Sequence, residues 1–83
     1  MNRFFLHQEI DGEILEDPDG TEAADLAEVR QQAIEAARQL VANAILGGTA
    51  PLGKAFRITD EAGRVLLVLP FRDALPPNLF NSG

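Results

Sequence analysis

The stretch DLAEVRQQAIEAARQLVANAIL, residues Asp25 to Leu46, decides the fold. Its apolar residues recur at steps of three and four, which places them on one face of a helix. They are Leu26, Val29, Ala33, Ala37, Leu40 and Ala44, flanked by Ile34, Val41 and Ile45. The stretch contains no Gly or Pro, and most of its residues favour helix. The sequence therefore predicts one amphipathic helix whose apolar face needs a second layer to cover it.

The sequence also marks both ends of this helix. Asp25 and Glu28 have the spacing of a capping box, in which side-chain oxygens accept hydrogen bonds from the free amides of the first turn. Gly47 and Gly48 can adopt the left-handed backbone that ends a helix. We expect Thr21 to Ala24 to lead into the helix without a strand of their own.

The segments on both sides of the helix have the patterns of β-strands. We expect strands at residues 3–9, 13–16, 56–59 and 64–69. Asp11-Gly12 is a strong hairpin turn because both residues tolerate the positive φ that it needs, and residues 60–63 form the second turn. The predicted fold is α+β in the order ββαββ. It is an antiparallel four-stranded sheet of two hairpins with the helix packed on one face, and the strand order stays open.

Composition limits the classes of function. With 83 residues, 46% of them hydrophobic, the chain can form one domain with a modest core. We assign residues 1–75 to this domain and residues 76–83, which contain Pro76 and Pro77, to a flexible C-terminal tail. The net charge of −6 opposes binding to nucleic acid or to anionic membranes. The absence of cysteine excludes disulfides, and no stretch is long enough for a signal peptide or a membrane span, so we expect a cytoplasmic protein.

Three motifs with possible chemistry lack essential parts. Residues 48–55 approach the phosphate-loop pattern, but Ala55 replaces the required hydroxyl and the loop follows a helix instead of preceding one. Asp17-Pro18-Asp19-Gly20 resembles part of a calcium loop without the remaining ligands. His7 is the only histidine and has no recognisable nucleophile or paired carboxylate beside it. We therefore expect no enzymatic activity, no cofactor, no metal and no small-molecule substrate.

The run Val65 to Leu69 is apolar at every position, so it presents apolar side chains on both faces of its strand. If Val65, Leu67 and Leu69 face the helix, then Leu66 and Val68 face away. Two interpretations remain open. In one, the tail residues Leu79 and Phe80 fold back over these side chains, or a few aliphatic side chains simply stay exposed. In the other, Leu66, Val68, Leu79 and Phe80 belong to a surface for self-association or for a protein partner.

Taken together, these motifs resemble a small bacterial family of unknown function. The resemblance rests on Phe4-Phe5-x-His7, Asp11-Gly12, Asp17-x-x-Gly20-x-Glu22, the Ala-rich helix, Asp60-x-x-Gly63-Arg64-Val65 and Val68-x-Pro70-Phe71. It covers roughly residues 3–75, and it implies a stand-alone chain of about this size from soil and plant-associated bacteria. The family carries no assigned activity or site residues.

The hairpin, acidic turn and acidic-capped helix also resemble the antitoxin domains of HicB type, although their Pro-Asp-Leu-Pro-Gly-Cys segment is absent here. We therefore expect a small non-catalytic interaction or self-associating protein. Self-association would give a homodimer in which the Leu66/Val68 face pairs with itself. The alternative is an antitoxin-like regulatory protein that binds a basic toxin or nuclease.

Overall fold

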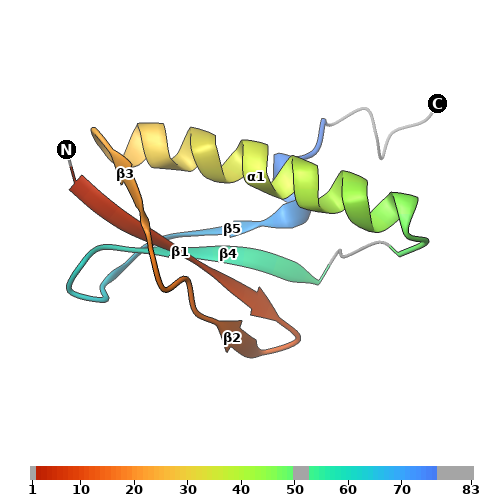
Figure 1. The fold of residues 1–83 in the computed structure, drawn as a ribbon, viewed down its shortest axis with the longest axis horizontal. Helices are drawn as coiled ribbons and strands as arrows, with labels where there is room; N and C mark the ends of the chain where they lie inside the picture. The colour runs from red at the N-terminus through yellow and green to blue at the C-terminus, as the bar shows by residue number, and fades with distance from the viewer. Residues whose placement is uncertain (1, 50–52, 77–83) are drawn as a thin grey trace.

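The computed structural model describes residues 2–49 and 53–76. The elements, in chain order, are β1 (Asn2–Ile10), β2 (Glu13–Leu15), β3 (Thr21–Ala23), α1 (Leu26–Leu46), β4 (Lys54–Thr59), β5 (Val65–Pro70) and the 3-10 helix η1 (Phe71–Ala74). Figure 1 shows α1 lying along one side of the sheet, with η1 close behind it. The α+β class, the single long helix and the antiparallel sheet are confirmed.

The sheet has five strands, so the prediction of four was wrong. Its order is β2-β1-β4-β5, and β3 pairs with the first residues of β1. All pairings are antiparallel. Thr21 to Ala23, which we expected to lead into the helix, form the additional strand β3. Three residues are too short for an alternating pattern to be visible in the sequence, and only the register against Asn2 to Phe4 makes them a strand.

The predicted hairpin turn and the predicted helix start have the expected local structure. Asp11 and Gly12 both have positive φ, 51° and 84°, as a two-residue hairpin turn requires. At the helix start, the Asp25 side chain accepts a hydrogen bond from the Glu28 amide at 2.9 Å. The Glu28 carboxylate accepts one from the Ala24 amide at 3.4 Å, one residue before the N-cap amide that a capping box uses, so the arrangement resembles the predicted capping box.

The core lies between α1 and the sheet. It contains the buried side chains of Phe4, Ala23, Val29, Ala33, Ile34, Ala37, Val41, Phe56, Ile58, Leu69, Phe71 and Ala74. The helix contributes mostly small residues, so it can approach the sheet closely. Phe71 of η1 is fully buried and its ring lies 4.9 Å from that of Phe56. Leu40, which the helical spacing predicts to be buried, is instead 36% exposed at the margin of the contact.

The short helix η1 closes the open side of the core and was not expected from the sequence. Phe71 and Ala74 are its buried residues. The Arg38 side chain of α1 reaches across and donates a hydrogen bond from Nε to the Ala74 carbonyl at 2.6 Å. The packed core therefore continues past β5 into η1.

Candidate functional site

The predicted interaction residues Leu66 and Val68 lie on β5, an edge strand whose only strand neighbour among the described residues is β4. Val68 is 44% exposed. Leu66 is partly buried and packs against the core, so it does not point away as we expected. Val65, which we expected to face the helix, is 44% exposed. The other two predicted residues, Leu79 and Phe80, lie outside the described residues.

A shift in register explains this exchange between Val65 and Leu66. Ile58 lies opposite Leu67, whereas Thr59 lies opposite Val65, so Leu66 is one residue more than β4 can pair with. Such a bulge sets two residues of one strand against one residue of the other and interrupts the strict alternation of faces. The exposed apolar pair on β5 is therefore Val65 and Val68. Nothing in the apolar run itself marks the position of a bulge.

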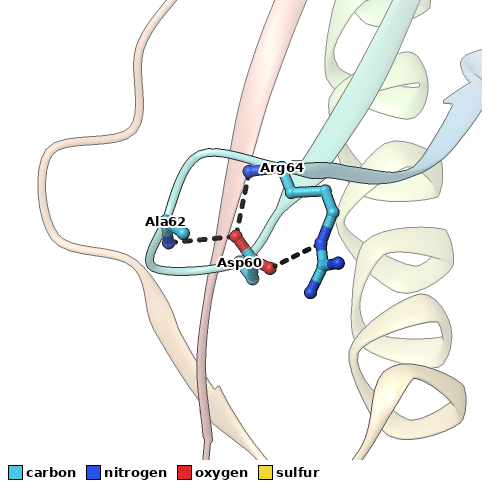
Figure 2. A network of polar contacts seen from close by, with 3 residues as sticks. All are labelled: Asp60, Ala62 and Arg64. Atoms are coloured by element: carbon cyan, nitrogen blue, oxygen red, sulfur yellow. Dashed lines mark hydrogen bonds and ion pairs between the residues drawn. The ribbon is translucent and has the colours of Figure 1, made fainter.

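The turn that leads into β5 is fixed by Asp60 (Figure 2). Its Oδ1 atom accepts hydrogen bonds from the amides of Ala62 at 3.0 Å and Arg64 at 2.9 Å, and its Oδ2 atom accepts one from Arg64 Nε at 3.2 Å. The hydrogen bond from the Arg64 amide is the main cause that lowers the pKa of this carboxyl group below 3.8. Asp60 thereby holds the first residues of β5 in place near neutral pH.

A second polar network holds the segment between β2 and β3. Three residues of β1, Phe5 to His7, face the five residues Glu16 to Gly20, which leave the regular ladder. Inside this segment, Asp17 Oδ2 accepts a hydrogen bond from the Leu6 amide at 3.2 Å. Asp17 Oδ1 accepts from the amides of Asp19 at 3.2 Å and Gly20 at 3.1 Å. One carboxylate therefore takes the place of backbone acceptors where the ladder is interrupted.

Burial raises the pKa of the Asp17 carboxyl group, but the hydrogen bonds from the amides of Gly20, Leu6 and Asp19 outweigh it and lower the pKa below 3.8. Asp17 is therefore ionised under ordinary conditions. In the Asp17-x-Asp19 pair, which resembles a calcium-loop fragment, the Asp17 carboxylate accepts hydrogen bonds from three backbone amides of its own chain.

His7 lies in the middle of this network. Its Nδ1 atom accepts a hydrogen bond from the Asp17 amide at 3.0 Å, and its Nε2 atom is 3.3 Å from the hydroxyl of Thr59, which is buried. The His7 ring stacks on the Phe5 ring, with 6.0 Å between centroids and 5° between planes. Because an amide donates to Nδ1, the neutral ring carries its proton on Nε2. Both nitrogen atoms thus have structural partners, consistent with a structural role.

A shallow hollow of about 330 Å³ opens beside this network on the sheet face away from α1. Its walls include the Phe5 and His7 rings and the four acidic residues Glu16, Asp17, Asp60 and Glu61. Asp17 and Asp60 are occupied by hydrogen bonds within the chain. Glu16 and Glu61 are exposed at its rim. In the described part of the chain, no group of three or more His, Cys, Asp or Glu side chains is arranged to hold a metal ion.

The phosphate-loop-like segment does not have the arrangement that phosphate binding needs. Gly48 follows the end of α1, and Lys54 begins β4, so the order is helix, loop, strand. Residues 50–52 of this loop lie outside the described residues. None of the helices in residues 2–49 and 53–76 is both long and apolar enough to cross a membrane.

The fold and these surfaces define a small α+β domain with an apolar edge strand. The model of the family described as "Domain of unknown function (DUF6894)" matches residues 3–72. The chain therefore belongs to this family, as its turn and strand motifs indicated. Neither a curated protein nor a solved structure matches the chain significantly.

Proposed function

We propose that this protein is a non-catalytic protein-interaction module and that its contact surface is the edge strand β5. The observation that carries the proposal concerns β5, the most apolar stretch of the chain. Among the described residues it pairs with a strand on one side only, and it exposes Val65 and Val68. An edge strand presents unpaired backbone amides and carbonyls, and soluble proteins usually protect such an edge with charged residues, Pro or a covering segment. In β5 only its last residue, Pro70, is of this kind.

A matched pair of substitutions tests this proposal. Val68→Lys places a charge on β5, and Ile14→Lys places the same charge on β2 at the opposite edge, where Ile14 is 45% exposed against 44% for Val68. Both variants should fold, because both sites are on the surface. We expect tagged Val68→Lys to lose the proteins that the tagged wild type captures, including any second copy of the chain, and Ile14→Lys to keep them. Equal capture by all three chains would refute β5 as the contact surface.

The alternative, an antitoxin-like protein that binds a basic partner, is supported by the net charge of −6 and by the acidic hollow beside Phe5 and His7. Exposed rim carboxylates attract a basic partner and accelerate its binding. Titration with an Arg-rich peptide at about 0.15 M salt, where the screening length is about 8 Å, tests it. We expect Glu16→Gln and Glu61→Gln to weaken binding, and Glu35→Gln on the exposed helix face to leave it unchanged. Equal effects of all three would indicate that only net charge matters.

A further inference from the structure

We propose that β5 pairs with β5 of a second copy of this chain, antiparallel and about a two-fold axis at Val68. This inference rests on the proposed function and names the partner. It makes a continuous sheet in the order β2-β1-β4-β5-β5-β4-β1-β2, with both α1 helices on the same face. The arrangement follows from three features of the described residues, taken in turn below.

The first feature is that the exposed apolar surface of β5 is narrow. On the neighbouring strand, Arg57 lies opposite Val68 and forms an ion pair with Glu9 of β1 at 2.8 Å. A partner that covered the whole sheet face would have to remove this pair from water, which costs free energy. A partner that extends the sheet at its edge contacts Val65 and Val68 and leaves Arg57 and Glu9 hydrated. The surface therefore suits strand addition.

The second feature is the contrast between the two edges of the sheet. The opposite edge is formed by β2 and β3, strands of three residues each, and the chain leaves the ladder between them at Glu16. Glu13, the first residue of β2, and Glu16, which follows the strand, add negative charge. Short length, irregular backbone and charge are the devices that protect an edge from pairing. β5 has six residues and none of them is charged, and its own irregularities are the bulge at Leu66 and Pro70 at its end, which leave Leu67 to Leu69 as its regular centre.

The third feature is that the centre of β5, Leu67-Val68-Leu69, matches itself when it is read in the opposite direction, whereas Leu66 lies opposite Pro70. With Val68 on the two-fold axis, Val68 lies opposite Val68 of the other copy and Leu67 lies opposite Leu69. Opposite residues of an antiparallel pair point to the same face, so the aliphatic side chains of the helix side meet one another. Such an isologous contact uses one surface twice and closes after two subunits.

The full-length chain itself provides the test, because it has no cysteine. Opposite residues in an antiparallel pair have Cα atoms about 4.5–5.5 Å apart, within the range of about 4.4–6.8 Å that a disulfide spans. Under mild oxidation we expect Val68→Cys to form a covalent dimer at least tenfold faster than Ile14→Cys, whose thiol is equally exposed. Light scattering over a dilution series should show the wild-type mass rising from 9.0 kDa towards twice that value.

The lysine variants separate this inference from the proposed function. Self-pairing predicts that Val68→Lys weakens dimer formation at least tenfold, whereas Ile14→Lys changes it less than twofold, with circular dichroism confirming that both are folded. A mass of 9.0 kDa at every concentration, or equal cross-linking rates of the two cysteine variants, would overturn self-pairing. If Val68→Lys nevertheless lost a different captured protein, the interaction function would stand with another partner. A dimer that Val68→Lys leaves intact would overturn both.

Discussion

At the scale of single residues, the carboxylate of Asp17 supplies hydrogen-bond acceptors at a place where the strand ladder beside β1 is interrupted. Between β2 and β3 the chain departs from β1, and the carboxylate of Asp17 accepts the amides of Leu6, Asp19 and Gly20 in place of backbone carbonyls. The folded protein loses stability when an amide in such a position has no hydrogen-bond acceptor. Asp17 is therefore a structural residue whose importance does not depend on any ligand.

Asp17→Asn should lower the free energy of unfolding near neutral pH by about 1–3 kcal/mol, because an amide oxygen is a weaker acceptor than a carboxylate and offers fewer lone pairs. Chemical denaturation measures this loss. Asp19→Asn makes the same change of charge two residues away, where the exposed side chain accepts none of these amides, and should cost less than about 0.5 kcal/mol. Equal losses in both variants would contradict the role of the Asp17 network.

The same carboxylate gives stability a defined dependence on pH. The pKa of Asp17 is lower in the folded chain than its ordinary value of 3.8, so folding favours the ionised form. Its contribution is fully present above the ordinary pKa and is lost as the pH falls from there through the lowered pKa. Asp60, also lowered, acts in the same direction. We expect the wild type to lose stability below about pH 4 and Asp17→Asn to lose less over this range. Thermal unfolding between pH 2 and 7 measures both slopes, and parallel curves would contradict the assignment.

Gly20 is required by both its backbone and its surroundings. Its φ is 73°, and a Cβ atom there would lie 2.9 Å from the Phe4 carbonyl oxygen and 2.9 Å from the Phe5 ring. Gly63 has a similar φ of 86° but open space around its Cβ position. Gly63→Ala should cost about 1–2 kcal/mol of backbone strain, and Gly20→Ala about 1–3 kcal/mol more because of the clash. Denaturation of the two variants measures the difference in their stability losses. Equal losses would show that β1 and the segment Glu16 to Gly20 can move apart without cost.

At the scale of elements, the sequence predicted the elements whose residue pattern repeats over many positions. It missed those that depend on contacts between segments far apart in the chain. Helix α1 begins and ends within one residue of the prediction because its apolar spacing, its cap and its terminal glycines all agree. Strand β3 is defined by its pairing with Asn2 to Phe4. Helix η1 is held in place by the packing of Phe71 against Phe56. The bulge at Leu66, which decides which valine is exposed, comes from the match between β4 and β5 and leaves no trace in the apolar run.

The helix also offers a test of where its buried face ends. Leu40 and Val41 are adjacent and both aliphatic, but Leu40 is 36% exposed and Val41 is 2% exposed. Val41→Ala should therefore cost about 2 kcal/mol of stability and Leu40→Ala less than about 1 kcal/mol, although leucine loses more atoms. Thermal denaturation of the two variants measures this order. The reverse order would mean that Leu40 has a contact in the folded protein beyond the described residues.

At the scale of the whole molecule, the charge of −6 opposes the association that the edge strand favours. Two copies repel each other over distances that salt shortens, from a screening length of about 30 Å at 0.01 M to about 8 Å at 0.15 M. Apolar contacts and backbone hydrogen bonds between the strands are much less sensitive to salt. We therefore expect the dimer to become tighter as salt rises over this range, and sedimentation equilibrium at both ends measures it. A dimer that dissociates on adding salt would instead be held by charge pairs.

The five residues Glu16 to Gly20 have a consequence for how far such molecules can assemble. They end β2 after three residues and interrupt this edge of the sheet. If β5 adds a strand as we propose, the sheet has one usable edge and a valence of one, whereas a sheet with two usable edges can grow into a fibril. We therefore expect growth to end at the first addition and a concentrated solution of the protein to hold finite particles.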